Sequence, residues 1–272
     1  MSDDTSSVSA VAHAIERVLE LGSIAALVTL IEGTLNVGAK LLVESNGSKT
    51  GSLGSPELDA SAIIEATPFL ASQDNARAIS GDQFAPDNSA LRGTRLLFER
   101  LQPEAQIVIC GAGHVGASLA KLAAAIGLTV TLIDDRSQFV SKDKFPEESI
   151  SLIATDSWSD AVRKSVGNGR GVSVAIVTRG HNEDEACLRA LIDLNPDYVG
   201  LIGSKRRTNI VLDRLREAGA TDEFRKKVRA PIGLDIGAVT PEEVALSILA
   251  EIVAERRGGK GGSLSSWRRR II

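Results

Sequence analysis

The chain has 272 residues and a formal net charge of −4, with 43% apolar, 24% charged and 3% aromatic residues. This balance is typical of a globular protein with an aliphatic core, and it calls for neither nucleic acid nor a membrane as a partner. The two cysteines lie far apart in the sequence, which excludes a disulfide framework, and the polar, acidic N-terminus is unlike a signal peptide. We therefore expect a cytoplasmic α/β protein.

The first 80 residues predict a small α+β domain. Apolar residues recur at helical spacing over residues 8–19, and two apolar runs follow at 24–31 and 39–43. The second run leads into Asn46-Gly47, a dipeptide that indicates a tight hairpin turn. A helix followed by paired strands is therefore the expected arrangement of this segment, residues 1–80.

Two segments lack a periodic apolar pattern. Residues 81–103 begin with a stretch rich in Gly, Pro, Asp, Asn and Ser, which predicts a linker that ends in a short helical lead-in. Residues 259–272 contain basic and no acidic side chains, which favours a basic, disordered tail.

Between them, residues 104–258 alternate apolar strand-like runs with amphipathic helical segments. Strands that are apolar on both faces and separated by helices predict a parallel sheet covered on both sides, which is the doubly wound Rossmann-like architecture. A helix beginning at Thr240 should close the domain, because Thr240 and Glu243 form a capping box around Pro241. The expected strands are 107–109, 130–133, 151–153, 172–177 and 198–202, and the expected helices between them are 115–126, 158–166, 184–194 and 207–218.

The strongest motif is the glycine-rich run at residues 111–116, Gly-Ala-Gly-His-Val-Gly, between a predicted strand and a predicted helix. Glycines there permit a tight turn and let the backbone approach a phosphate, which the helix N-terminus attracts. About 20 residues on, the next strand ends in Asp134, Asp135 and Arg136, where the ribose-binding acid of a dinucleotide fold belongs. The alternative is that these glycines serve only the packing of helix on strand.

Further polar residues follow later strands, and the carboxyl ends of parallel strands are where such folds bind ligands. His114 lies in the glycine-rich run and His181 follows the fourth strand, although a surface or capping role is an alternative for His181. Ser204, Lys205 and Arg206 follow the fifth strand, either as a phosphate cradle or as a capped, solvated helix start. The candidate cofactor-binding residues are Gly111, Gly113, His114, Val115, Gly116, Asp134, Asp135, Arg136, His181, Ser204, Lys205 and Arg206.

Four segments together resemble the XdhC/CoxI family, whose members are accessory factors for molybdenum hydroxylases such as xanthine dehydrogenase and carbon monoxide dehydrogenase. They are residues 110–116 with Asp134-Asp135-Arg136, then 178–181, 198–207 and 231–251. The resemblance implies a maturation factor, a chaperone rather than a catalyst, that binds the molybdenum cofactor, protects it during sulfuration and delivers it to the apo-enzyme. The implied partners are an apo molybdenum hydroxylase and a cysteine desulfurase, and a homodimer is left open.

The N-terminal segment departs from the family pattern. Members carry a segment resembling G-S-x-P-R-x-x-G-A and later G-T-x-G-G-G-C, whereas this chain has Gly-Thr-Leu-Asn-Val-Gly-Ala at 33–39 and lacks the Pro-Arg pair and the cysteine. The remaining cysteines, Cys110 and Cys187, are expected to be buried packing residues. We therefore expect the sulfur for cofactor sulfuration to come from another protein.

Two other readings stay open on the residues themselves. The glycine-rich run and the acids after the second strand also suit an NAD(P)-binding oxidoreductase, although the sequence shows no separate substrate domain and no acid–base constellation. A nucleotide-sensing module without chemistry is the third reading.

Overall fold

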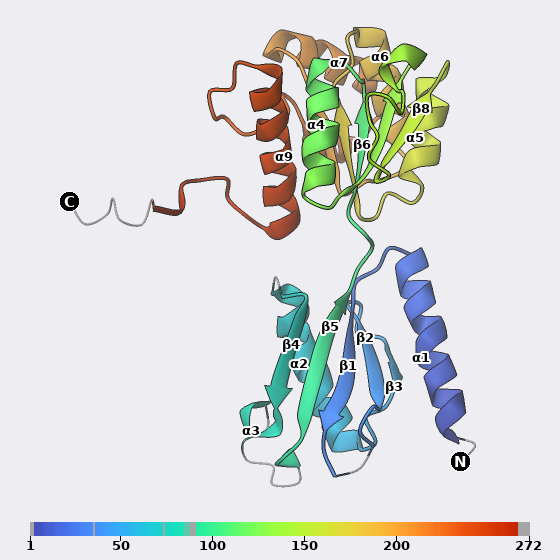
Figure 1. Ribbon diagram of the computed structural model, residues 1–272, viewed down its shortest axis with the longest axis vertical. Helices are drawn as coiled ribbons and strands as arrows, with labels where there is room; N and C mark the ends of the chain where they lie inside the picture. Colours follow the sequence, from blue (N-terminus) through green and yellow to red (C-terminus); the bar gives the residue numbers. More distant parts are fainter. Residues whose placement is uncertain (1–2, 35, 73, 85, 87–90, 266–272) are drawn as a thin grey trace, which may run out of the picture. The chain divides into compact units, whose positions relative to one another are not determined.

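The computed structural model describes residues 3–34, 36–72, 74–84, 86 and 91–265, and it divides the chain into two compact units, Met1–Pro103 and Glu104–Ile272 (Figure 1). Half of the expected basic tail, residues 266–272, lies outside the described residues, which end at Ser265.

The first unit is a five-stranded antiparallel sheet in the order β3-β2-β1-β5-β4, with a long helix on each face. This arrangement confirms the predicted α+β character of the N-terminal region. The hairpin at Asn46-Gly47 is also confirmed, because β2 and β3 pair across it. The elements are α1 (Asp3–Glu20), β1 (Ala25–Glu32), β2 (Lys40–Glu44), β3 (Lys49–Gly51), α2 (Pro56–Ala71), β4 (Ala76–Ser80), α3 (Gly81–Phe84) and β5 (Arg95–Leu101).

The two helices of this unit lie on opposite faces because side chains alternate along each strand. In β1, Ala25 packs with Val18 of α1, whereas Ala26 and Val28 pack with Phe69 and other residues of α2. Each face of the sheet therefore has its own apolar core.

The expected linker at residues 81–103 is wrong over most of its described part. Residues 95–101 form β5, which pairs with β1 on one side and β4 on the other and is thus an inner strand. Leu96 and Phe98 are fully buried, two residues apart, so their spacing is that of a strand rather than of the helical lead-in that the apolar run suggested. The first unit therefore ends at Pro103, later than the expected end of the N-terminal domain at residue 80.

The second unit is a six-stranded parallel sheet in the order β11-β10-β9-β6-β7-β8. Counted from β6 as the first strand, this is the order 3-2-1-4-5-6 of the Rossmann fold, so the predicted fold class is confirmed. Its strands are β6 (Gln106–Cys110), β7 (Thr129–Asp134), β8 (Ile150–Ala154), β9 (Val172–Ile176), β10 (Tyr198–Leu201) and β11 (Val228–Arg229), and its helices are α4 (His114–Ala125), the 3₁₀ turn η2 (Ser137–Phe139), α5 (Trp158–Val166), α6 (His181–Leu191), α7 (Lys205–Glu217), α8 (Asp222–Lys227) and α9 (Pro241–Arg257).

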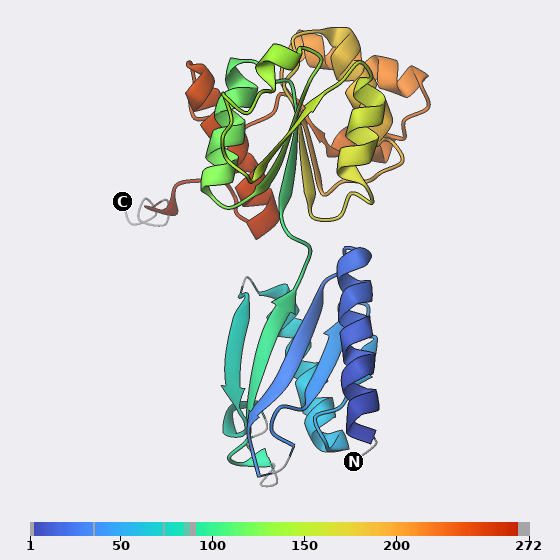
Figure 2. The same cartoon turned by 45° about the vertical axis from the view of Figure 1, so that its right-hand side comes forward.

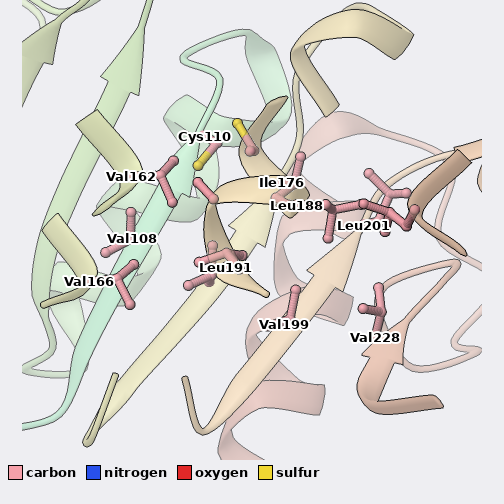
Figure 3. Close-up of a cluster of buried hydrophobic side chains, with 14 of the residues drawn as sticks. Val108, Cys110, Val162, Val166, Ile176, Leu188, Leu191, Val199, Leu201 and Val228 are labelled. Atoms are coloured by element: carbon pink, nitrogen blue, oxygen red, sulfur yellow. The ribbon is translucent and has the colours of Figure 1, made fainter. Parts of the chain in front are cut away.

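Helices cover both faces of this sheet (Figure 2). In β6, Ile107 and Ile109 pack against α4 and α9, while Val108 and Cys110 pack against α5 and α6 on the other face. The second of these clusters is drawn in Figure 3, where valine and leucine side chains from strands and helices fill the space between them. These layers are mostly aliphatic, which matches the low aromatic content of the chain.

The last helix follows the predicted signals. Thr240 caps α9 through a bond from the Glu243 N–H, and the Glu243 carboxylate accepts in return from the Thr240 N–H, which confirms the capping box. α8 and β11, in contrast, were not expected, because residues 222–229 are too short and too charged to give a periodic signal. Over the described residues, no helix combines the length and the apolar character that a membrane span needs.

Candidate functional site

The three glycines of the glycine-rich run have three different roles. Gly111 has a φ of +112°, and a Cβ there would lie 2.6 Å from the carbonyl oxygen of Val177 after the neighbouring strand β9. A Cβ on Gly116 would lie 1.8 Å from the carbonyl oxygen of Gly111, so α4 can pack against β6 only with glycine at this place. A Cβ on Gly113 would meet no atom within 4 Å, so the turn itself does not require glycine there. The space above Gly113 is open, as a closely approaching ligand needs.

The N-terminus of α4 has no side chain of its own to cap it. Gly113 is the N-cap residue, and no side-chain cap bond is made. The N–H groups of the first helical turn have no partner within a helix, and the helix dipole adds positive potential at this end. His114 and Val115 supply two of these groups. The end of α4 is therefore suited to an anion such as a phosphate.

Asp134, at the end of β7, is buried and fully engaged by the protein. One carboxylate oxygen accepts from the Ala112 N–H at 2.7 Å, and Arg136 donates to both oxygens through Nε at 2.8 Å and Nη2 at 3.0 Å. Burial alone would raise the pKa of Asp134, but the hydrogen bonds from Arg136 and from the Ala112 backbone outweigh it and lower that pKa. Asp134 thus holds the glycine-rich turn in shape, and its carboxylate is the member of the run Asp134-Asp135-Arg136 that the protein itself engages most fully.

A pocket opens beside this turn. Asp135 faces Arg179, which follows β9, and the two form an ion pair at 2.7 Å. The pocket therefore has two guanidinium groups near Gly113, that of Arg136 from the segment after β7 and that of Arg179 from the segment after β9. Its lining residues are Gly111, Gly113, Asp134, Asp135, Arg136, Trp158, Val177, Thr178, Arg179 and Glu183.

A second buried network links the loops after β9 and β10. Asp184 of α6 has no exposed surface, and it accepts from Thr178 Oγ1 at 2.5 Å and from Arg207 Nη2 at 2.5 Å and Nε at 3.0 Å. Burial raises the pKa of Asp184 more than the bonds from Thr178 and Arg207 lower it. Arg207 also donates to the Thr178 carbonyl, at 3.4 Å, so one side chain joins the first turn of α7 to the edge of the pocket.

The two candidate histidines, His114 and His181, follow neighbouring strands and lie at the same edge of the sheet. His114 begins α4 after β6, and His181 begins α6 after β9, and both are exposed. Neither lines the pocket. In the part of the chain that the structure describes, no group of three or more His, Cys, Asp and Glu side chains is arranged to hold a metal ion.

The basic loop after β10 has a structural role at its first residue. Ser204 caps α7 by accepting from the Arg207 N–H at 3.3 Å. Arg206 is exposed, and the Lys205 side chain lies outside the described part of the structure. Arg207, which the sequence did not single out, donates to the Thr178 carbonyl at the ligand edge, the carboxyl ends of the strands where the pocket opens.

Other functional candidates were missed as well. Trp158, Thr178 and Arg179 line the pocket, and each lies shortly after the end of a strand. Their position at the carboxyl edge was the available signal for these residues. The Asp134–Arg136 pairing, in contrast, depends on how the turn closes and leaves no mark in the sequence.

Cys110 and Cys187 are both fully buried, as predicted. Both belong to the same core cluster, in which Cys110 lies on β6 and Cys187 on α6. Figure 3 labels Cys110 in this cluster. Burial raises the pKa of the Cys187 thiol, and the contact with Cys110 raises it further. A protonated, inaccessible thiol is a poor carrier of sulfur.

The sequence pattern of the XdhC Rossmann domain matches residues 107–252, which run from β6 to the last turns of α9. The chain belongs to this family. A second pattern, that of pyridine nucleotide-disulphide oxidoreductases, matches residues 8–162. That range crosses the boundary between the two units and ends inside α5, before β9, so it coincides with neither unit. The XdhC match instead contains the whole ligand edge.

Three curated relatives of this XdhC-family chain are known by name. It is 29% identical over 82% of its length to the uncharacterized protein YqeB of Escherichia coli. It is 28% identical over 60% of its length to a probable xanthine dehydrogenase subunit of Bacillus subtilis, and 27% identical over 57% to the molybdenum cofactor insertion chaperone PaoD of E. coli. The aligned regions are 41%, 47% and 41% of these relatives, so the chain spans less than half of their length.

A crystal structure of a xanthine dehydrogenase from Bacillus halodurans has a similar fold. It superposes with a TM-score of 0.51 at 19% identity and covers 94% of this chain and 98% of the other. At this identity the likeness concerns the fold alone.

Proposed function

We propose that this chain binds the molybdenum cofactor as a transient cargo and promotes its insertion into a molybdenum hydroxylase of the xanthine dehydrogenase or carbon monoxide dehydrogenase type. Membership of the XdhC family supports this, and so do two relatives, one described as a molybdenum cofactor insertion chaperone and the other as a probable xanthine dehydrogenase subunit. The role is that of a chaperone, and the hydroxylation chemistry belongs to the cofactor once it sits in the recipient enzyme.

The observation that carries the proposal is the open turn at Gly113 in front of the uncapped N-terminus of α4. The cofactor is an anion through its phosphate, and backbone N–H groups at a helix N-terminus bind phosphate without a cationic side chain. The residues present therefore fit that end of the cargo. In this proposal His114 and Val115 offer their backbone N–H groups, and Gly113 leaves the space that the phosphate enters.

The remaining candidate residues have subsidiary roles in this proposal. Arg136 and Arg179 flank the pocket and offset the negative charge of the cargo. His114 and His181, exposed at the same edge, supply hydrogen-bond donors for the molybdenum–oxo end. Lys205 and Arg206, after β10, contribute longer-range attraction for the anion, which added salt would screen.

Protein purified from a host grown with molybdate should carry a pterin. We expect mass spectrometry of small molecules released by denaturation to detect the pterin phosphate in the wild-type protein. The matched control is the same chain with Glu57→Gln, an exposed change on α2, which should carry the same amount. Preparations that contain a nicotinamide nucleotide and no pterin would contradict the proposal.

We also propose that the sulfur for cofactor sulfuration comes from a separate cysteine desulfurase, because both thiols of this chain are buried. Cys110→Ala together with Cys187→Ala should leave pterin content and the activation of a partner hydroxylase largely unchanged, once any loss of stability is corrected for. The paired change His114→Ala and His181→Ala should lower activation. Loss of activation by Cys110→Ala alone, with the fold and the pterin content preserved, would instead make Cys110 a working thiol.

An NAD(P)-binding oxidoreductase is the second candidate, favoured by the Rossmann strand order and the second sequence pattern. One observation counts against it. Both oxygens of Asp134, one of the two acids at the end of β7, already accept from Ala112 and Arg136, so only Asp135 of this pair is open to a ribose. Titration with NADH, followed by nicotinamide fluorescence, distinguishes the two candidates.

A further inference from the structure

We propose that Arg136 and Trp158 form a subsite for a planar heteroaromatic ring. It lies next to the phosphate seat, which is the proposed phosphate-binding position at Gly113 and the N-terminus of α4. The proposal rests on the proposed function, since it assigns the ring end of the same ligand. The class of ligand is therefore a flat heteroaromatic ring joined to a phosphate, and a pterin or a nucleobase would supply that ring.

The guanidinium of Arg136 is fixed in one orientation. Its Nε and Nη2 atoms donate to the two oxygens of Asp134, which fixes the plane of the group. The ring of Phe139 lies below the guanidinium carbon, with the ring centroid 3.8 Å away. One edge and one face of the guanidinium are thus occupied by the protein itself.

We infer that the other face is open to a ligand. The Arg136 side chain keeps 27% of its surface exposed, and it lines the pocket. A guanidinium held flat, with one free face, is a stacking surface for an aromatic ring. Because Asp134 and Phe139 already order this side chain, stacking on it costs little further conformational entropy.

Trp158 provides the aromatic partner in the same pocket. It begins α5 after the Ser157 cap, it is partly buried against the core, and it lines the pocket together with Arg136 and Gly113. An indole presents a large apolar surface to a base or pterin, which carries its own π-face. The open glycine and the two stacking side chains therefore belong to one pocket, which suits a ring and a phosphate on the same molecule.

The test compares two phosphates that differ only by the ring. AMP should bind the wild-type protein at least about tenfold more tightly than ribose 5-phosphate, because one stacked base contributes about that much. 6-Hydroxymethylpterin phosphate is the second ring probe. The chain has two tryptophans, so a Trp267→Phe background makes Trp158 fluorescence the reporter of ring binding.

Variants of the two stacking residues should remove only the ring advantage, which is the tighter binding of a ring phosphate relative to ribose 5-phosphate. Trp158→Leu should bring the affinity for the preferred ring phosphate down to that of ribose 5-phosphate, and the latter affinity should not change. Arg136→Lys should lower the ratio of the two affinities as well. Trp158→Phe keeps a ring and should retain part of the advantage, which guards against a loss of fold in the leucine variant. Arg163→Lys, an exposed arginine on the same helix, is the matched control and should behave as wild type.

The outcomes separate this subsite from the proposed function. If neither ring phosphate binds more tightly than ribose 5-phosphate, including the case in which none of them binds, the subsite is wrong, whatever pterin the purified protein carries. If Trp158→Leu keeps the full ring advantage, the assignment is also wrong. A ring advantage for AMP without one for the pterin phosphate supports the subsite and counts against the molybdenum cofactor as cargo.

Discussion

Gly116→Ala is expected to destabilise the protein strongly, and Gly113→Val, three residues away, is expected to abolish ligand binding without unfolding it. The alanine methyl group at 116 would lie 1.8 Å from the Gly111 carbonyl oxygen, a backbone atom that cannot move without opening the turn. We expect a loss of about 3 kcal/mol or more in the free energy of unfolding, as for overpacked backbone contacts. Denaturant unfolding measures it.

Gly113→Val has the opposite pattern. The valine meets no protein atom at its Cβ and sits at an ordinary backbone conformation, so the melting temperature should stay within about 4 °C of wild type. The side chain occupies the space in front of the α4 N-terminus, so the pterin content of the purified protein should fall to background. A Gly113→Val protein with normal pterin content would show that the phosphate seat is elsewhere.

Asp134→Asn is expected to cost about 2 to 4 kcal/mol in the free energy of unfolding at pH 7, since it breaks a buried, bidentate ion pair and removes a carboxylate that also holds the Ala112 N–H. Asp135→Asn is the control next to it. Asp135 pairs at the surface with Arg179, so its loss should cost less than about 1 kcal/mol.

The difference between wild type and Asp134→Asn should depend on pH. The pKa of Asp134 is lowered below its ordinary value of 3.8 in the folded state. Its stabilisation is therefore complete above that value and is lost as the pH falls through the lowered folded-state pKa. Unfolding measured from pH 7 down to the acid range should show the two proteins converging below about pH 3.8. A gap that stays constant would mean that Asp134 acts through its shape alone.

The Rossmann unit could be predicted well from the sequence because each of its elements is marked by residues within that element. Each strand is a short apolar run, each helix has a cap or a periodic face, and the glycine-rich turn lies where the first strand meets α4. The N-terminal unit was harder. β5 is an inner strand that pairs with β1, whose partner residues lie 63 to 76 positions earlier, and that pairing distinguishes its Leu-Leu-Phe run from a helical turn.

The candidate site was predictable by position and less so by role. Gly113 was predicted from the glycine-rich run, and Asp134 and Arg136 from their place at the end of the second strand; all three line the pocket. Asp134 turned inward, because its carboxylate satisfies a backbone N–H that the tight turn leaves without a partner. Arg207 was not predicted, because its contact with Asp184 from the first turn of α7 depends on how the two loops pack.

The hydrogen-bond network of Thr178, Asp184 and Arg207 should hold the segments after β9 and β10 in one conformation before any ligand binds. It joins the loops after β9 and β10 through a carboxylate with no exposed surface, so these loops should move together and stay in place. Loops that are already ordered let a ligand bind without a large loss of conformational entropy. Loops held in this way do not act as a flap that releases the cargo of the proposed function, so we expect the handover to depend on the acceptor, which must compete for the ligand from the open side of the pocket.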